Sequence, residues 1–202
     1  PLVDYRKIQY DAATGTVTLP EGMEIDLGSV AKGYAGQLAA QMLREHGVQS
    51  ALLNLGGNVQ TVGAKPDGSP WQIGIKDPQG EDAMMVLSVE DQAVVTSGGY
   101  ERYFEQDGQT YWHIMDPSTG HPADSGLISV TIVGDEGVVC DGLSTALFVM
   151  GLEKAADLWA QSGDFEAVFV TASGEVYITE GLRDRFALTE QYADTPVSVI
   201  ER

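Results

Sequence analysis

The sequence has few cysteines, few histidines and little positive charge. Its 202 residues include one cysteine and three scattered histidines, which excludes an internal disulfide and a zinc site of the Cys/His type. Lysine and arginine total 11 against 30 acidic residues, giving a net charge of −19. Such a surface repels a phosphodiester backbone, which argues against nucleic acid as a partner. An anionic ligand would need a metal ion to offset this charge.

A long apolar run is also missing. The longest run, residues 146–152, is far shorter than the ~20 residues that span a bilayer. The chain does not open with a signal-peptide pattern, and its first residue is Pro1 rather than methionine. We therefore expect that a segment was removed upstream, so targeting and anchoring cannot be read from these residues.

Glycine, in contrast, is abundant, with 24 of 202 residues against a usual share of ~7%. Hydrophobic residues at 43% and charged residues at 20% are typical of a globular chain. The length predicts a single domain over residues 1–202. The predicted order of strands, one long helix, more strands, two helices and final strands indicates an α+β fold with mixed, mostly antiparallel sheets packed against helices.

The most regular pattern predicts a helix between Gly28 and Gly47. Apolar residues repeat every fourth position, at Val30, Tyr34, Leu38 and Met42, and Gly28 or Ser29 is expected to start the helix. Residues 138–140, in contrast, are typical of a buried strand in which Cys140 serves as a small hydrophobic residue.

Two kinds of glycine-rich segment could bind a ligand. Residues 26–33 (DLGSVAKG) lead directly into the long helix, where free N–H groups and Lys32 could hold an anion. An ordinary helix start with a solvated lysine explains the same pattern. Residues 54–58 (NLGGN) and 96–100 (TSGGY) end predicted strands in paired glycines, which a flat ligand could approach closely. Tight hairpins explain these two segments as well.

Two further segments carry side chains suited to catalysis. His113 ends a predicted strand, and a neutral imidazole there is a candidate general base, although a structural histidine fits the pattern too. Asp141 and Thr145 lie four residues apart at a predicted helix start, so both can face one point. Oxygen ligands of this kind suit Mg²⁺ or Ca²⁺, while an N-cap is an equally simple explanation for the aspartate.

Taken in order, these five segments resemble the ApbE family of FAD:protein FMN transferases. The resemblance extends from about residue 23 to about residue 152. It implies a mixed α/β fold related to the tunnelling fold, with FAD bound as substrate and Mg²⁺ as cofactor. It further implies transfer of FMN from FAD to a Ser or Thr hydroxyl of an acceptor flavoprotein, with release of AMP.

The resemblance also implies roles for individual residues. The implied metal ligands are the Asp141 carboxylate, the Thr145 hydroxyl and the backbone carbonyl of Ser29. The implied FAD-binding residues are Lys32, Thr96, Gly98, His113 and Ile114. His113 is also expected at the reacting end of the site as the catalytic base.

Family members usually carry a further part before this region, so we expect these residues to form the C-terminal two-thirds of a longer protein. By resemblance, that protein would be a lipoprotein held at the membrane, outside the cytoplasm. Two alternatives remain open from the sequence. Water could replace the acceptor, which would make the protein an FAD pyrophosphatase giving FMN and AMP, or the chain could be a non-catalytic flavin-binding fragment. The sequence gives no indication of an oligomeric state.

Overall fold

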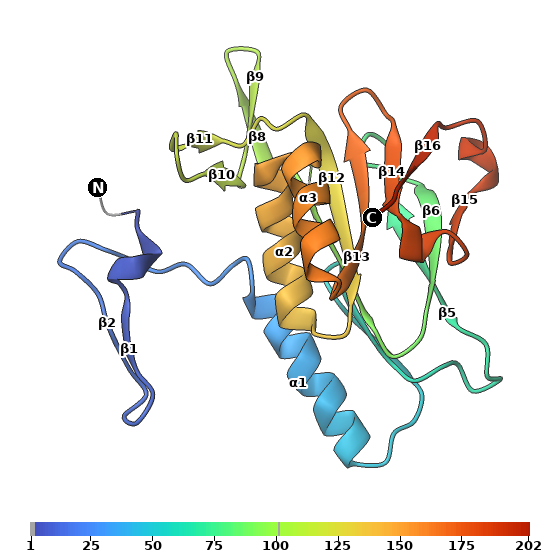
Figure 1. Ribbon diagram of the computed structural model, residues 1–202, viewed down its shortest axis with the longest axis horizontal. Coiled ribbons are helices and arrows are strands. Elements are labelled where there is room, and N and C mark those ends of the chain that lie inside the picture. Colours follow the sequence, from blue (N-terminus) through green and yellow to red (C-terminus); the bar gives the residue numbers. More distant parts are fainter. Residues whose placement is uncertain (1–2, 101) are drawn as a thin grey trace.

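The computed structural model describes residues 3–100 and 102–202, and a seven-stranded sheet forms its centre (Figure 1). Its strands run in the order β16-β14-β13-β12-β7-β4-β3, and every neighbouring pair is antiparallel except β14 and β16. The bounds are Ala51–Leu55 (β3), Asn58–Val62 (β4), Ala93–Gly98 (β7), Leu127–Gly134 (β12), Phe165–Thr171 (β13), Val176–Thr179 (β14) and Val197–Ile200 (β16).

The two faces of this sheet are covered differently. The α-helices pack on one face: α1 (Ala31–Glu45), α2 (Gly137–Met150) and α3 (Leu152–Ser162). A smaller sheet covers the other face: β5 (Trp71–Lys76), β6 (Ala83–Val89) and β15 (Phe186–Leu188). Strand alternation supplies both cores, since Ile132 faces the helices and its neighbour Val133 faces the small sheet. The result is three packed layers.

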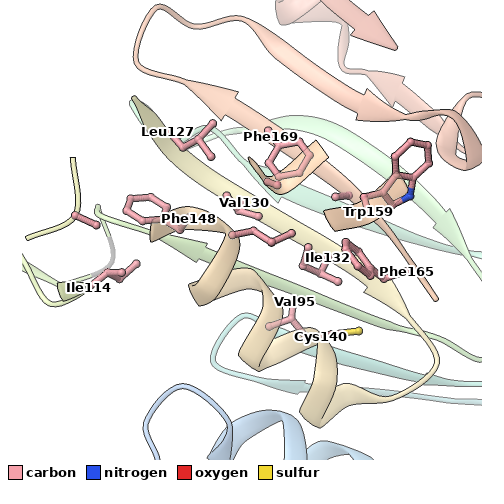
Figure 2. Close-up of a cluster of buried hydrophobic side chains, with 14 of the residues drawn as sticks. Val95, Ile114, Leu127, Val130, Ile132, Cys140, Phe148, Trp159, Phe165 and Phe169 are labelled. Carbon is pink, nitrogen blue, oxygen red and sulfur yellow. The ribbon is translucent and has the colours of Figure 1, made fainter. Parts of the chain in front are cut away.

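The helix-side core lies under the length of α2. Figure 2 shows Phe148 and Ile114 at one end of this cluster and Cys140 at the other. The core therefore connects the start of α2 with the segment around Ile114.

Short hairpins complete the fold. They are β1 (Gln9–Asp11) with β2 (Thr16–Thr18), β8 (Tyr103–Gln106) with β9 (Gln109–Trp112), and β10 (Met115–Asp116) with β11 (His121–Pro122). Single 3₁₀ turns lie at η1 (Tyr5–Lys7), η2 (Glu180–Leu182) and η3 (Glu190–Tyr192). In Figure 1, the β1–β2 hairpin stands apart from the three layers and the β8–β9 hairpin projects beyond them. No helix in the described parts of the chain is long and apolar enough to cross a membrane.

The predicted α+β class with mostly antiparallel sheets is confirmed. The predicted strand over 138–140 is wrong, because these residues lie in the first turns of α2. The Val138 N–H donates to the Gln37 side chain at 3.1 Å, and Cys140 packs into the core as a small hydrophobic residue, as expected. Packing against α1 and the sheet thus outweighs the local β preference of two consecutive valines.

The predicted long helix is present as α1, but it buries an unexpected face. The buried positions carry small residues, Gly33, Gly36 and Ala40. Larger residues of the apolar repeat are exposed, with Tyr34 55% and Met42 60% accessible. The helix begins after Val30, which has no side-chain oxygen for a cap, rather than at Gly28 or Ser29. The small buried face allows α1 to approach its neighbours closely.

Candidate active site

The centre of the site is a contact between two helices. Asp141 lies near the start of α2 and is 4% exposed. Its Oδ2 accepts a hydrogen bond of 2.7 Å from the Gly33 N–H in the first turn of α1. The first turn of a helix carries free N–H groups and partial positive charge, which favours an anion. The anion at the start of α1 is therefore a side chain of the protein itself, the Asp141 carboxylate.

Glycine makes this contact possible. A Cβ on Gly33 would overlap the Gly137 carbonyl and lie 2.6 Å from the Asp141 Cβ. A Cβ on Gly137 would lie 2.9 Å from the Gly33 oxygen. The helices thus cross at two positions where neither has a side chain, and this crossing sets Asp141 against α1.

Burial raises the pKa of the Asp141 carboxyl above its usual range, because the charged form loses water. The Gly33 N–H and the positive charge of Lys32 oppose this rise. The Asn58 amide opposes it as well, although no hydrogen bond of normal geometry joins Asn58 to Asp141 within the described residues. Lys32 is exposed, and its Nζ lies 3.5 Å from the Gly56 carbonyl oxygen. Three of the predicted segments, 26–33, 54–58 and 141–145, therefore meet here.

Thr145 brings in a fourth segment. It lies one turn beyond Asp141, and its Oγ1 is 3.2 Å from the Ser97 Oγ, which is 2.8 Å from the Ser144 Oγ. The predicted residue Thr96 lies on the opposite face of the sheet, where its hydroxyl pairs with Thr131 at 2.8 Å. Sequence reasoning missed Ser97: alternation places it on the face of Val95, but valines at both 94 and 95 do not show which face meets the helices.

Ser29 lies in the turn that precedes α1 and is exposed. The Leu27 carbonyl accepts from the Val30 and Ala31 N–H groups, at 3.0 and 2.9 Å, which fixes this turn. The Val30 side chain lies 3.4 Å from the position that a Cβ on Gly142 would take. The turn that carries Ser29 is therefore packed against α2 beside Asp141.

His113 lies outside this cluster, between β9 and β10, and is exposed. Its backbone N–H and its ring Nδ1 lie 3.1 and 3.2 Å from the Arg102 carbonyl oxygen. A carbonyl can only accept, so Nδ1 carries the proton in this contact and Nε2 keeps a free lone pair. In the neutral tautomer that this contact selects, the lone pair is therefore on Nε2.

The surroundings of His113 are anchored to the far end of α2. Trp112 packs edge-on against Phe148, with ring centroids 6.3 Å apart, and donates from Nε1 to the Ala123 carbonyl at 3.1 Å. Ile114 is buried, and its carbonyl accepts from the Ala123 N–H at 2.9 Å. Phe148 lies about two turns beyond Asp141, or ~10 Å along the helix axis. The segment that carries His113 is thus packed against α2 about two turns beyond Asp141.

An aromatic pocket of about 270 Å³ lies beside Trp112, lined by Tyr100, Tyr103 and Phe148 among others. Gly98 and Gly99 border this region, and a Cβ on Gly99 would lie 2.9 Å from the Trp112 ring. The Trp112 ring therefore packs directly on the Gly99 backbone at the edge of this aromatic pocket. A larger hollow of about 870 Å³, lined by Arg44 and Arg185 among others, lies at the opposite end of β7 and away from these residues.

The ApbE family model matches residues 1–169, more than half of the chain. The chain belongs to the ApbE family. It is 40% identical to the FAD:protein FMN transferase of Klebsiella pneumoniae (strain 342) over 185 residues, which cover 90% of this chain and 57% of that protein. It is 39% identical to the protein of the same name from Treponema pallidum (strain Nichols), over 90% of this chain and 55% of the relative.

Solved ApbE structures share the fold. The ApbE protein of Thermotoga maritima superposes with a TM-score of 0.83 at 38% identity, over 90% of this chain and 60% of that one. The apo form of the Pseudomonas stutzeri flavinyl transferase ApbE gives a TM-score of 0.71 at 34% identity, over 92% and 54%. This chain therefore spans between about half and three fifths of the length of these ApbE relatives.

The oxygen groups of this ApbE chain fit a hard cation such as Mg²⁺. In the described residues, 3–100 and 102–202, no group of three or more His, Cys, Asp or Glu side chains could hold a metal. The site offers instead the buried Asp141 carboxylate and the Thr145 hydroxyl, beside the turn that carries Ser29. Mg²⁺ is often held by one or two carboxylates together with substrate phosphates. A cation here would also compensate the buried charge of Asp141.

Proposed function

We propose that the protein to which these residues belong transfers FMN from FAD to a Ser or Thr hydroxyl of an acceptor flavoprotein, with Mg²⁺ as cofactor and AMP as product. The observation that carries the proposal is the contact of Asp141 with Gly33. It gathers a carboxylate, a hydroxyl and a helix start in one place, in a chain whose relatives are named FAD:protein FMN transferases.

The reaction exchanges one phosphorus–oxygen bond for another. The acceptor hydroxyl oxygen bonds to the FMN phosphorus, the bond from that phosphorus to the oxygen bridging to AMP breaks, and the hydroxyl proton passes to a base. Bound at Asp141, Thr145 and the Ser29 carbonyl, Mg²⁺ would offset charge on the pyrophosphate oxygens. Lys32, exposed at the same helix start, would approach the diphosphate.

His113 is the proposed base. The Arg102 carbonyl holds the Nδ1 proton in place, so Nε2 receives the hydroxyl proton. The resemblance implies that Thr96, Gly98 and Ile114 line the flavin or phosphate region of FAD. Gly98 and Ile114 border the Trp112 region and support this role through their backbone, whereas Thr96 would have to contact FAD from the other face of the sheet.

The full-length protein provides the test. Incubation with FAD, Mg²⁺ and an acceptor domain should add the mass of FMN to the acceptor and release an equal amount of AMP. Asp141→Ala should abolish both products, and Thr145→Val should weaken activity less because it removes only a neutral ligand. Wild-type protein that gives neither product with any acceptor would contradict the proposal.

Hydrolysis of FAD is a second candidate, favoured by the exposure of His113, which leaves the proposed base open to water. Water would then take the place of the acceptor hydroxyl, with the same base. Release of AMP and free FMN at an equal rate with and without acceptor, with no change in acceptor mass, would identify this activity.

On the family likeness alone, we also propose that the protein acts outside the cytoplasm as a membrane-anchored lipoprotein. Fractionation of cells that express the complete reading frame tests this location, and recovery in the cytoplasmic fraction would contradict it.

A further inference from the structure

Two buried amide side chains behind Asp141 have no partner for their polar atoms. Asn58 and Gln60 are each 1% exposed, and among the described residues none of their side-chain nitrogen or oxygen atoms makes a hydrogen bond. Both lie on β4 and, by alternation with Val59, face the helices. Unpaired amides are thus concentrated on one short stretch of strand.

These amides lie beneath the crossing of α1 and α2. The Asn58 Oδ1 lies 3.7 Å from the position of a Cβ on Gly36, and the Gln60 Oε1 lies 2.5 Å from that of a Cβ on Gly137. Asn58 is also close enough to influence the Asp141 carboxylate. Gly137, one of the two glycines that seat Asp141 against α1, therefore also leaves space for Gln60, and Gly36 leaves space for Asn58.

Packing alone does not account for these two residues. Burying an amide without a partner is unfavourable, whereas an apolar residue of similar volume would stabilise the same position. Asp141, in turn, receives one hydrogen bond on Oδ2 from a backbone N–H, and a neutral donor on the strand side would fix the rotation of its carboxylate. Groups that orient a metal ligand in this way commonly change metal affinity 10- to 100-fold when removed.

We propose that Asn58 is a positioning residue that orients the Asp141 carboxylate for a divalent cation, with Gln60 packed behind it to restrict the Asn58 amide. This inference rests on the proposed function, because it requires that Asp141 binds the cation. It adds a residue of segment 54–58 to the site and gives the second glycine-rich turn a role.

The test measures Mn²⁺ binding by electron paramagnetic resonance, with and without FAD, on the full-length protein. Asn58→Leu removes the amide at similar volume and should weaken Mn²⁺ binding about tenfold or more, without lowering Tm. Val59→Ala is the matched control on the opposite face of β4, where it should lower Tm and leave Mn²⁺ affinity unchanged. The Mg²⁺ concentration that gives half-maximal FAD turnover should rise for Asn58→Leu, with kcat recovered at saturating Mg²⁺.

Mn²⁺ affinity within twofold of wild type in a folded Asn58→Leu protein would overturn the positioning role and leave the proposed function intact. Should the leucine variant fail to fold, Asn58→Ala, which adds no volume, is measured in the same way and against the same threshold. Wild-type protein that binds no Mn²⁺, even with FAD, would overturn both proposals together.

Discussion

At Asp141, folding stability and cation binding favour opposite protonation states of the carboxyl group. Its carboxylate is buried against α1, which favours the neutral form, while binding a cation requires the charged form. Such a conflict between fold and function is common where a protein prepares a site for a charged ligand. It also gives the site a measurable dependence on pH.

Asp141→Asn should make the metal-free protein more stable at pH 7. The pKa of this carboxyl is higher in the folded state than its unfolded value of 3.8, so the folded state holds the proton more tightly and stability falls as pH rises above about 4. Asparagine removes the charge and keeps an oxygen for the Gly33 N–H. Urea unfolding between pH 3 and pH 8 measures the difference, which should grow with pH. Equal stability of the two proteins across this range would show that the carboxylate is not buried as described.

His113→Asn tests the proposed base. Turnover of FAD should fall roughly 10²-fold or more, with FAD affinity nearly unchanged, because the side chain acts on the proton of the acceptor. AMP release and equilibrium FAD binding measure the two effects separately. A variant that loses FAD binding altogether would assign His113 to cofactor packing instead.

At the scale of elements, the crossing of α1 and α2 should be the most sensitive contact of the site. Gly33→Ala should destabilise the protein by about 1 to 3 kcal/mol, because the added methyl group meets the backbone of Gly137. Gly36→Ala is the control on the same helix: its Cβ would lie 3.6 Å or more from its neighbours, and alanine favours the helix, so we expect no loss of stability. Thermal unfolding measures both, and equal effects would show that the crossing is looser than described.

The same crossing shows what local sequence patterns can predict. The four-residue repeat and Gly47 predict α1 correctly, since both signals are local: the repeat runs along the helix and Gly47 directly follows its C-cap, His46. Which face of α1 is buried depends on α2, about a hundred residues further along the chain. The large apolar residues of the repeat therefore suggest a buried face that is in fact exposed. Whether Ser97 or Thr96 lies beside Thr145 could not be predicted for a similar reason, because it depends on which face of β7 meets α2.

At the scale of the whole molecule, the order of strands in the sheets could not be predicted from the sequence. Short β-rich runs at 71–76 and 176–179 predict two strands with the bounds that β5 and β14 have, yet no local signal places them in different sheets. Pairing of distant strands, such as β16 beside β14, depends on the assembled core rather than on turns. The five ordered motifs, in contrast, indicate the family without any knowledge of the strand order.

The reactivity of the Cys140 thiol measures whether the helix-side core stays closed. The thiol is 1% exposed, and burial raises its pKa to about 12. At pH 8 the thiolate fraction is then about 10³-fold below that of an exposed cysteine, and access is also blocked. Ellman's reagent should react with the native protein at least 10³-fold more slowly than with the urea-unfolded chain. Rapid labelling under native conditions would indicate that the α2 layer opens without global unfolding.

The hydrogen bond from Gly33 to Asp141 joins residues separated by 108 positions. A ribosome therefore synthesises α1 about a hundred residues before it synthesises Asp141, and until then the Gly33 N–H lacks this acceptor. Contacts of such long range also slow folding. A chain cut between α1 and α2 therefore has the helix start but lacks the carboxylate, so this contact cannot form in it.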